Sequence, residues 1–92
     1  MFLEIVSPEA TLFGQEVTAV SVPGINGEFQ MLNNHAAIVS VLGKGTVKIQ
    51  GDALEIAEEF QANFQKEGTN YSIAINSGTV EMKDNKVVVL VD

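Results

Sequence analysis

Turn-forming residues divide this chain into short apolar segments, and this pattern favours strands over long helices in most of it. The pattern is clearest between Gly24 and Gly45. Gly24 and Gly27 bracket a tight turn, because glycine adopts positive φ without a steric cost. After this turn come the apolar segment Phe29–Leu32, the turn-forming pair Asn33-Asn34 and a longer apolar run, Ala36–Leu42.

Other segments have the composition and spacing of strands. Val47 and Ile49 alternate with polar residues, which predicts a strand with one buried face. Five consecutive apolar residues in Lys86–Val91 are typical of a strand that is covered on both faces. The remaining strand-like segments are Phe2–Ser7, Thr11–Phe13, Glu16–Val22, Tyr71–Ile75 and Thr79–Lys83. We therefore expect residues 1–92 to form an all-β, single-domain β-sandwich or flattened barrel of about eight to ten short strands.

Two pairs of residues suggest how neighbouring strands are connected. Gly14-Gln15 has glycine at the first central position of a type II′ turn, so it predicts a hairpin between Thr11–Phe13 and Glu16–Val22. Asp84-Asn85 predicts a second two-residue turn, of a type that requires positive φ.

Residues 51–68 fit two alternatives. Leu54, Ala57, Phe60 (or Gln61) and Phe64 recur at roughly helical spacing, and Asp52 could cap the N-terminus of a short helix near residues 53–64. A pair of irregular strands is also compatible with this segment. We favour the helix.

Composition and charge exclude several classes of function. Hydrophobic residues make up 46% of the 92 residues, as in ordinary folded domains. Twelve acidic residues against five basic ones give a net charge of −7, which argues against binding to nucleic acid or to anionic lipid. The chain has no cysteine, no signal-peptide pattern at its start and no apolar run of membrane-spanning length. We therefore expect neither a disulfide nor direct insertion into a membrane.

The sequence contains few residues that could form a catalytic, cofactor or metal site. Glu28 and His35 lie at the two ends of one short apolar segment of about 13 Å and could form a general acid/base pair. No serine beside them has the elbow motif of a nucleophile. A single histidine without cysteine gives no metal-ligand spacing, and Gly24–Gly27 is not followed by the GK[ST] of a phosphate loop. We expect no catalytic, cofactor or metal site.

The motifs taken together resemble those of a known family, the epsilon subunit of F-type ATP synthases. The likeness covers nearly the whole chain apart from about residues 51–70. The matching motifs are Gly27-Glu28-Phe29, Leu32, Asn34-His35-Ala36, Ile38–Leu42, the opening Glu4–Glu9 with Leu12-Phe13, Gly14–Pro23, and the closing Ser77–Met82, Asn85 and Lys86–Asp92.

This resemblance implies a ten-stranded β-sandwich and a non-catalytic role in the rotor stalk. Its partners would be the gamma subunit and the c-ring subunits, with the catalytic head as an indirect partner. The subunit would couple ion-driven rotation to ATP synthesis, on the cytoplasmic face of the bacterial plasma membrane. By position, Glu28 and His35 match residues that face the c ring, and Ser40 matches part of the surface that faces gamma. The alternative is a free-standing β-sandwich that binds a ligand or protein; one tyrosine and no tryptophan disfavour an aromatic-lined pocket.

The chain departs from the family pattern in two places. Asn33-Asn34 replaces the usual proline-glycine, and Ala37 replaces the proline usual after the histidine-alanine pair. We expect the same path for this loop with less rigidity. Many family members also continue into a two-helix C-terminal hairpin, whereas this sequence stops at Asp92. On that basis we expect neither inhibition by such helices nor ATP binding by these 92 residues.

Overall fold

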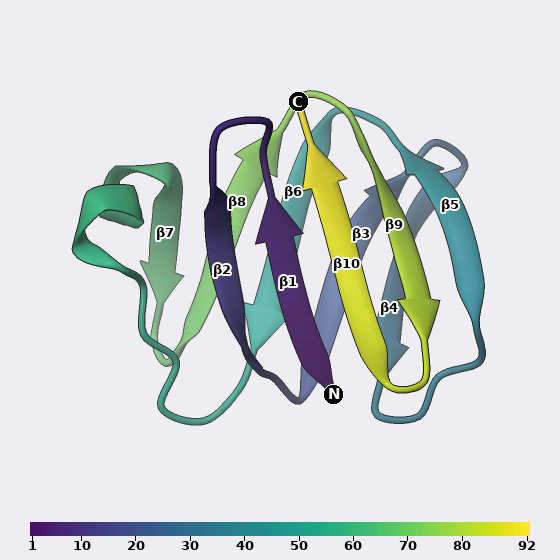
Figure 1. The fold of residues 1–92 in the computed structure, drawn as a ribbon, viewed down its shortest axis with the longest axis horizontal. Helices are drawn as coiled ribbons and strands as arrows, with labels where there is room; N and C mark the ends of the chain where they lie inside the picture. Colours follow the sequence, from purple (N-terminus) through teal and green to yellow (C-terminus); the bar gives the residue numbers. More distant parts are fainter.

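The computed structural model describes all residues 1–92 and consists mainly of strands (Figure 1). This confirms the predicted all-β fold of eight to ten strands. One short 3₁₀ helix, η1, spans Glu58–Asn63. The strands are β1 Phe2–Val6, β2 Thr11–Glu16, β3 Ala19–Gly24, β4 Gly27–Leu32, β5 Ile38–Leu42, β6 Gly45–Gln50, β7 Phe64–Glu67, β8 Asn70–Ile75, β9 Gly78–Lys83 and β10 Lys86–Val91.

The strands form one curled sheet that folds back over itself. Hydrogen bonds connect them in the order β2-β1-β10-β9-β5-β3-β6-β8-β7, and β4 pairs with β3. The fold-over lies between β5 and β3, which are paired only through Leu42 and Gly24. Figure 1 shows the two resulting layers: β2, β1, β10, β9 and β5 lie in front of β7, β8, β6, β3 and β4.

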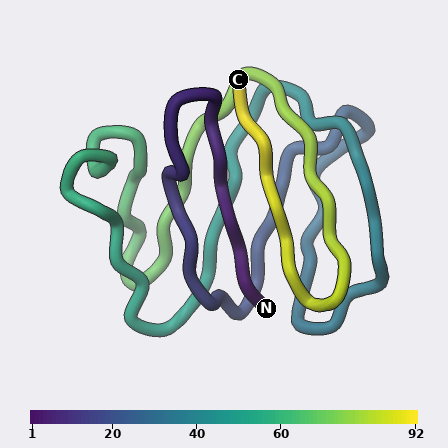
Figure 2. The backbone as a smooth tube through the Cα atoms, in the orientation of Figure 1, coloured from purple at the N-terminus to yellow at the C-terminus, as the bar shows by residue number.

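The first and last strands lie side by side in the front layer. β1 and β10 are paired in parallel, from Phe2 opposite Lys86 to Val6 opposite Leu90. The backbone trace in Figure 2 accordingly places the two chain ends at opposite ends of these neighbouring strands. This parallel pair joins the β1–β2 unit to the β9–β10 hairpin.

Alternate side chains from the two layers fill the space between them. Val47 and Ile49 are fully buried whereas Lys48 and Gln50 are exposed, as the alternation predicted. The same period buries Val80 and Met82 on β9. Each fully buried side chain of this size contributes about 1.5–3 kcal/mol to folding through removal of apolar surface from water. Other fully buried side chains are Leu3, Ile5, Val20, Val22, Met31, Val87 and Val89.

The expectation that β10 is covered on both faces is wrong for this chain by itself. Val87, Val89 and Val91 are buried, but Val88 is only half-buried and Leu90 is 50% exposed. The physical reason is that the outer face of the front layer has no second layer packed on it.

The predicted hairpin turn at Gly14-Gln15 is also wrong. Both residues lie inside β2, opposite Glu4 and Leu3 of β1, and β2 does not pair with β3. The chain passes from β2 to β3 through residues 17 and 18 instead. Gln15 has a different role: its side-chain amide donates to the carbonyl oxygen of Glu55 and accepts from the Glu55 N–H at 3.1 Å. The segment before η1 therefore lies against β2.

Residues 51–68 contain parts of both alternatives. Only Glu58–Asn63 is helical, Asp52 does not cap this helix, and β7 follows it directly. Leu54, Ile56 and Phe64 are buried, whereas Ala57 is exposed. The apolar spacing in this segment therefore reflects separate buried side chains and not one face of a longer helix. The only helix, η1, has six residues. It lacks the length and the apolar character needed to cross a membrane.

The predicted turns elsewhere are confirmed. Asp84 and Asn85 have φ of 52° and 61° and join β9 to β10. Asn34 has φ of 62° in the connection between β4 and β5. Gly24 lies opposite Gly27, which has φ of 122°, so these glycines bracket the β3–β4 turn as expected.

Substitution of two strand glycines tests this packing. A Cβ added to Gly78 would lie 2.2 Å from the carbonyl oxygen of Leu90, so Gly78→Ala should lower the free energy of unfolding by about 1–3 kcal/mol through overpacking. Gly14→Ala is the matched control, because its Cβ would come no closer than 3.7 Å to another atom, at Phe2 Cζ. Urea unfolding followed by circular dichroism measures both; equal stability of the two variants would contradict the strand arrangement around Gly78.

Candidate functional site

Glu28 lies within a strand instead of in the loop where the sequence suggested it. It is the second residue of β4 and pairs with Pro23 of β3. Phe29 and Met31 point toward the core, so Glu28 points to the outer face of the back layer. Its Oε1 lies 3.2 Å from Nζ of Lys48 on β6, and about half of each side chain is exposed. Glu28 is therefore one member of a surface ion pair.

His35 lies in the connection between β4 and β5, and its side chain is exposed. Its backbone N–H donates to the carbonyl oxygen of Leu32 at 3.0 Å, and Nδ1 lies 2.7 Å from the carbonyl oxygen of Ala36. Glu28 and His35 thus lie at the two ends of β4, with separate polar partners. The structure does not bring them together as an acid/base pair.

Ser40 lies at the centre of β5, opposite Val80 of β9. Since Val80 is buried, Ser40 lies on the inner face of the front layer, where it is half-buried. Its neighbours Val39 and Val41 point outward and are 73% and 55% exposed. The surface around Ser40 is therefore formed by these two valines more than by its own hydroxyl group.

Four outward side chains of β5 and β10 form an apolar surface, which we call the valine face: Val39, Val41, Val88 and Leu90. Lys86, the first residue of β10, also points outward and borders this surface. Outward Thr79 and Glu81 of β9 lie between these two strands. Val39, Val88 and Leu90 also line a shallow depression of about 260 Å³. The resemblance pointed to Ser40 and the strand around it, but not to the outward residues of β10. The signal for these residues was the apolar character of both strands, in which Ser40 and Lys86 are the only polar residues.

The β3–β4 turn lies next to one end of β5. The Ile25 N–H donates to the carbonyl oxygen of Val41 at 3.3 Å, and the Gly43 N–H donates to that of Pro23 at 2.8 Å. Ile25 itself is 63% exposed. An exposed apolar side chain therefore lies close to the end of the valine face.

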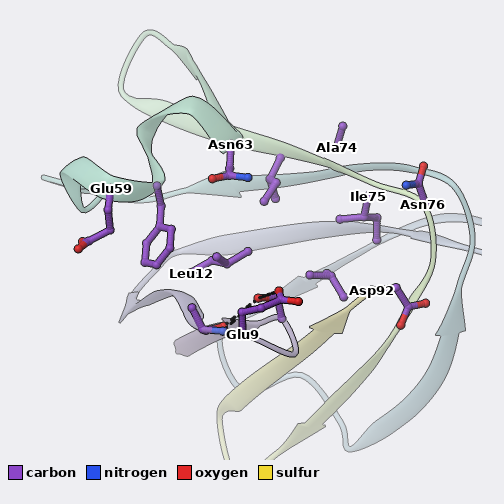
Figure 3. A pocket seen from close by; sticks show the side chains of 13 residues that line it. Glu9, Leu12, Glu59, Asn63, Ala74, Ile75, Asn76 and Asp92 are labelled. Carbon is purple, nitrogen blue, oxygen red and sulfur yellow. Dashed lines mark hydrogen bonds between the residues drawn. The ribbon is translucent and has the colours of Figure 1, made fainter.

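The largest cavity, of about 410 Å³, lies where the β1–β2 connection, η1 and the end of β10 meet. Figure 3 shows three acidic side chains around it, those of Glu9, Glu59 and Asp92. Phe60 is the only aromatic residue in its lining. The structure brings together no group of three or more His, Cys, Asp or Glu side chains that could hold a metal ion. An open acidic cavity of this kind is not the aromatic-lined pocket that a ligand-binding module would require.

Comparison with known proteins shows the family to which the chain belongs. A family model described as ATP synthase, Delta/Epsilon chain, beta-sandwich domain matches residues 1–92. The ATP synthase epsilon chain of Campylobacter fetus subsp. fetus is 39% identical over 90 residues, which cover 98% of this chain and 59% of that protein. The epsilon chain of Sulfurovum sp. is 35% identical over 92 residues, which cover 100% of this chain and 61% of that protein. The chain thus spans about three fifths of the length of these relatives.

Two solved structures share the fold. In the mitochondrial ATP synthase of Euglena gracilis (OSCP/F1/c-ring, rotational state 1), one chain matches with a TM-score of 0.75 at 19% identity, over 97% of this chain and 48% of that chain. In the central stalk/c-ring structure of Tetrahymena thermophila mitochondrial ATP synthase, the TM-score is 0.72 at 14% identity, over 98% of this chain and 61% of that chain. At such identities the likeness concerns the fold. The match of the family model across residues 1–92 shows that this chain belongs to the family of the ATP synthase delta/epsilon chain β-sandwich domain.

Proposed function

We propose that this chain is the β-sandwich part of a non-catalytic rotor-stalk subunit of an F-type ATP synthase. In this role it links the gamma subunit to the c ring and so couples ion-driven rotation to ATP synthesis in the catalytic head. It works as part of a membrane-associated complex, on the cytoplasmic face of the bacterial plasma membrane. Family membership supports the assignment to the synthase, and the uncovered valine face is the observation that carries the proposal of a binding role.

The valine face is the surface we assign to the gamma subunit. β10 has apolar residues on both of its faces, but only the inner face is covered within this chain. Covering the exposed parts of Val39, Val41 and Leu90 would be favourable by about 25 cal/mol for each Å² of apolar surface removed from water. Ser40 lies on the same strand, half-buried, with exposed valines on either side. We therefore place its strand in the gamma-facing surface, with the valines as the main contacts.

The surface along β4 is the one we assign to the c ring. Glu28 is exposed near the start of β4 and His35 is exposed just beyond its end, so a partner that contacts both lies along the strand, which is about 20 Å long. Glu28 is paired with Lys48, so this surface presents both signs of charge to its partner. Charges at the edge of an interface set the orientation and selectivity of binding more than its affinity. Glu28 and His35 accordingly act as contact residues, not as catalytic ones.

Introducing a charge on the valine face tests the gamma contact. Val41→Lys should weaken binding to the matching gamma subunit at least tenfold, since Val41 lies opposite Thr79 and a lysine there would lose its hydration in an apolar interface without a charged partner. Leu32→Lys is the matched control: Leu32 is also an exposed apolar side chain, at 53%, but it lies on β4 in the other layer. Binding is measured by isothermal titration calorimetry after gel filtration of the mixed subunits. Equal losses in both variants, or no complex with the unaltered chain, would contradict the assignment.

Charge reversal and truncation on β4 test the c-ring contact. Glu28→Lys and His35→Ala should each retain binding to gamma but reduce proton- or sodium-driven ATP synthesis by the reassembled complex. Both should leave the free energy of unfolding within about 1 kcal/mol of the original, because an exposed ion pair contributes about 0.2–1 kcal/mol. Glu58→Lys, an equal charge reversal on η1, is the control and should leave coupling unchanged. Normal coupling in both β4 variants would exclude this surface as the c-ring contact.

A further inference from the structure

Asn85 forms hydrogen bonds with the connection between β4 and β5, which carries His35. The N–H of Asn34 donates to Oδ1 of Asn85 at 2.7 Å. Nδ2 of Asn85 in turn donates to Oδ1 of Asn33 at 3.0 Å. Asn85 lies in the β9–β10 turn, and Figure 1 shows this turn and the β4–β5 connection at the same end of the molecule. One side chain thus joins two loops that are about fifty residues apart in the sequence.

Asn85 is itself fixed in place. Its φ of 61° belongs to the two-residue turn it forms with Asp84, and asparagine tolerates this region better than most residues. Its carbonyl oxygen accepts the N–H of Phe2 at 3.1 Å, so the turn is also tied to β1. Asn85 is half-buried, whereas Asp84 is exposed and makes no side-chain hydrogen bond or ion pair. The amide of Asn85 is therefore presented to the β4–β5 connection from a well-anchored turn.

The β4–β5 connection has few constraints of its own. Its local contacts are the His35 N–H to Leu32 and the His35 ring to Ala36. Asn33, Asn34 and Ala37 have no ring that restricts the backbone, unlike proline. Asn33 Oδ1 also accepts a hydrogen bond from the Met1 ammonium group at 2.9 Å. Apart from that contact, Asn85 provides the hydrogen bonds that tie this connection to the rest of the fold.

We infer that Asn85 is a positioning residue for the His35 loop. Its amide holds residues 33–37 in one conformation. A partner that binds His35 therefore does not have to order this loop, and the entropic cost of binding is lower. The positioning role concerns this chain alone; its consequence for binding rests on the proposed function. The hydrogen bonds of Asn85 to Asn34 and Asn33 thereby restrict the loop in place of a proline ring.

Amide hydrogen exchange in the free chain tests the positioning role. Asn85→Gly keeps the positive φ of the turn but removes the side-chain amide, so the Asn34 N–H should exchange roughly fivefold faster. Asn85→Asp keeps an acceptor for that N–H but loses the donor to Asn33, so its effect should be smaller. Asp84→Gly is the matched control, since it alters the same turn at φ of 52° without touching the loop. Exchange at Asn34 that is unchanged in Asn85→Gly, or equally fast in Asp84→Gly, would overturn the inference.

A double-mutant cycle with the complex of gamma and the c ring tests the consequence for binding. Asn85→Gly should weaken binding about as much as His35→Ala, and the double variant should lose little more than either, because both changes remove the same contact. Fully additive losses would overturn the link between Asn85 and His35. If His35→Ala alone has no effect on binding, the proposed c-ring contact fails, whereas faster exchange in Asn85→Gly would still support the positioning role.

Discussion

Apolar packing between the two strand layers holds this structure together. The inward side chains of β1, β10 and β9 meet those of β3 and β6, and those at the centre, such as Ile5 and Ile49, are completely buried. The core residues come from strands of both layers, distributed along the whole chain. Each layer therefore depends on the other to keep its apolar face away from water. Since the chain has no cysteine and therefore no disulfide, packing and backbone hydrogen bonds supply its stability.

The same construction leaves surfaces of different character on the outside. On the front layer, Val39 and Leu90 are exposed although their strands have the composition of buried ones. On β4, the Glu28–Lys48 ion pair lies on the outer face, and the exposed His35 follows the end of the strand. An apolar face and a mixed-charge edge suit two different neighbours, and this division supports a linking subunit better than a ligand-binding module.

The sequence predicted the elements whose signals are local. Alternation at Val47 and Ile49, and positive φ at Asp84-Asn85, identified a strand and a turn correctly. Gly14 misled because glycine occurs in an edge strand as well as in a hairpin turn, and only the pairing of β2 with β1 decides between them. Among the site residues, Glu28 and His35 are exposed, and their contact roles stay predictions. The ion pair with Lys48 and the contacts of Asn85 join residues distant in sequence, so no local pattern could reveal them.

The parallel pairing of β1 with β10 also governs how the molecule can be assembled during synthesis. Residues 2–6 emerge from the ribosome first, yet their neighbour on one side, residues 86–90, emerges among the last of this sequence. Until then, β1 lacks its hydrogen-bonded neighbour on that side. Contacts across such a long separation slow folding, because the closure of a large loop must precede any gain from them. The front layer is therefore complete only when β10 takes its place between β1 and β9.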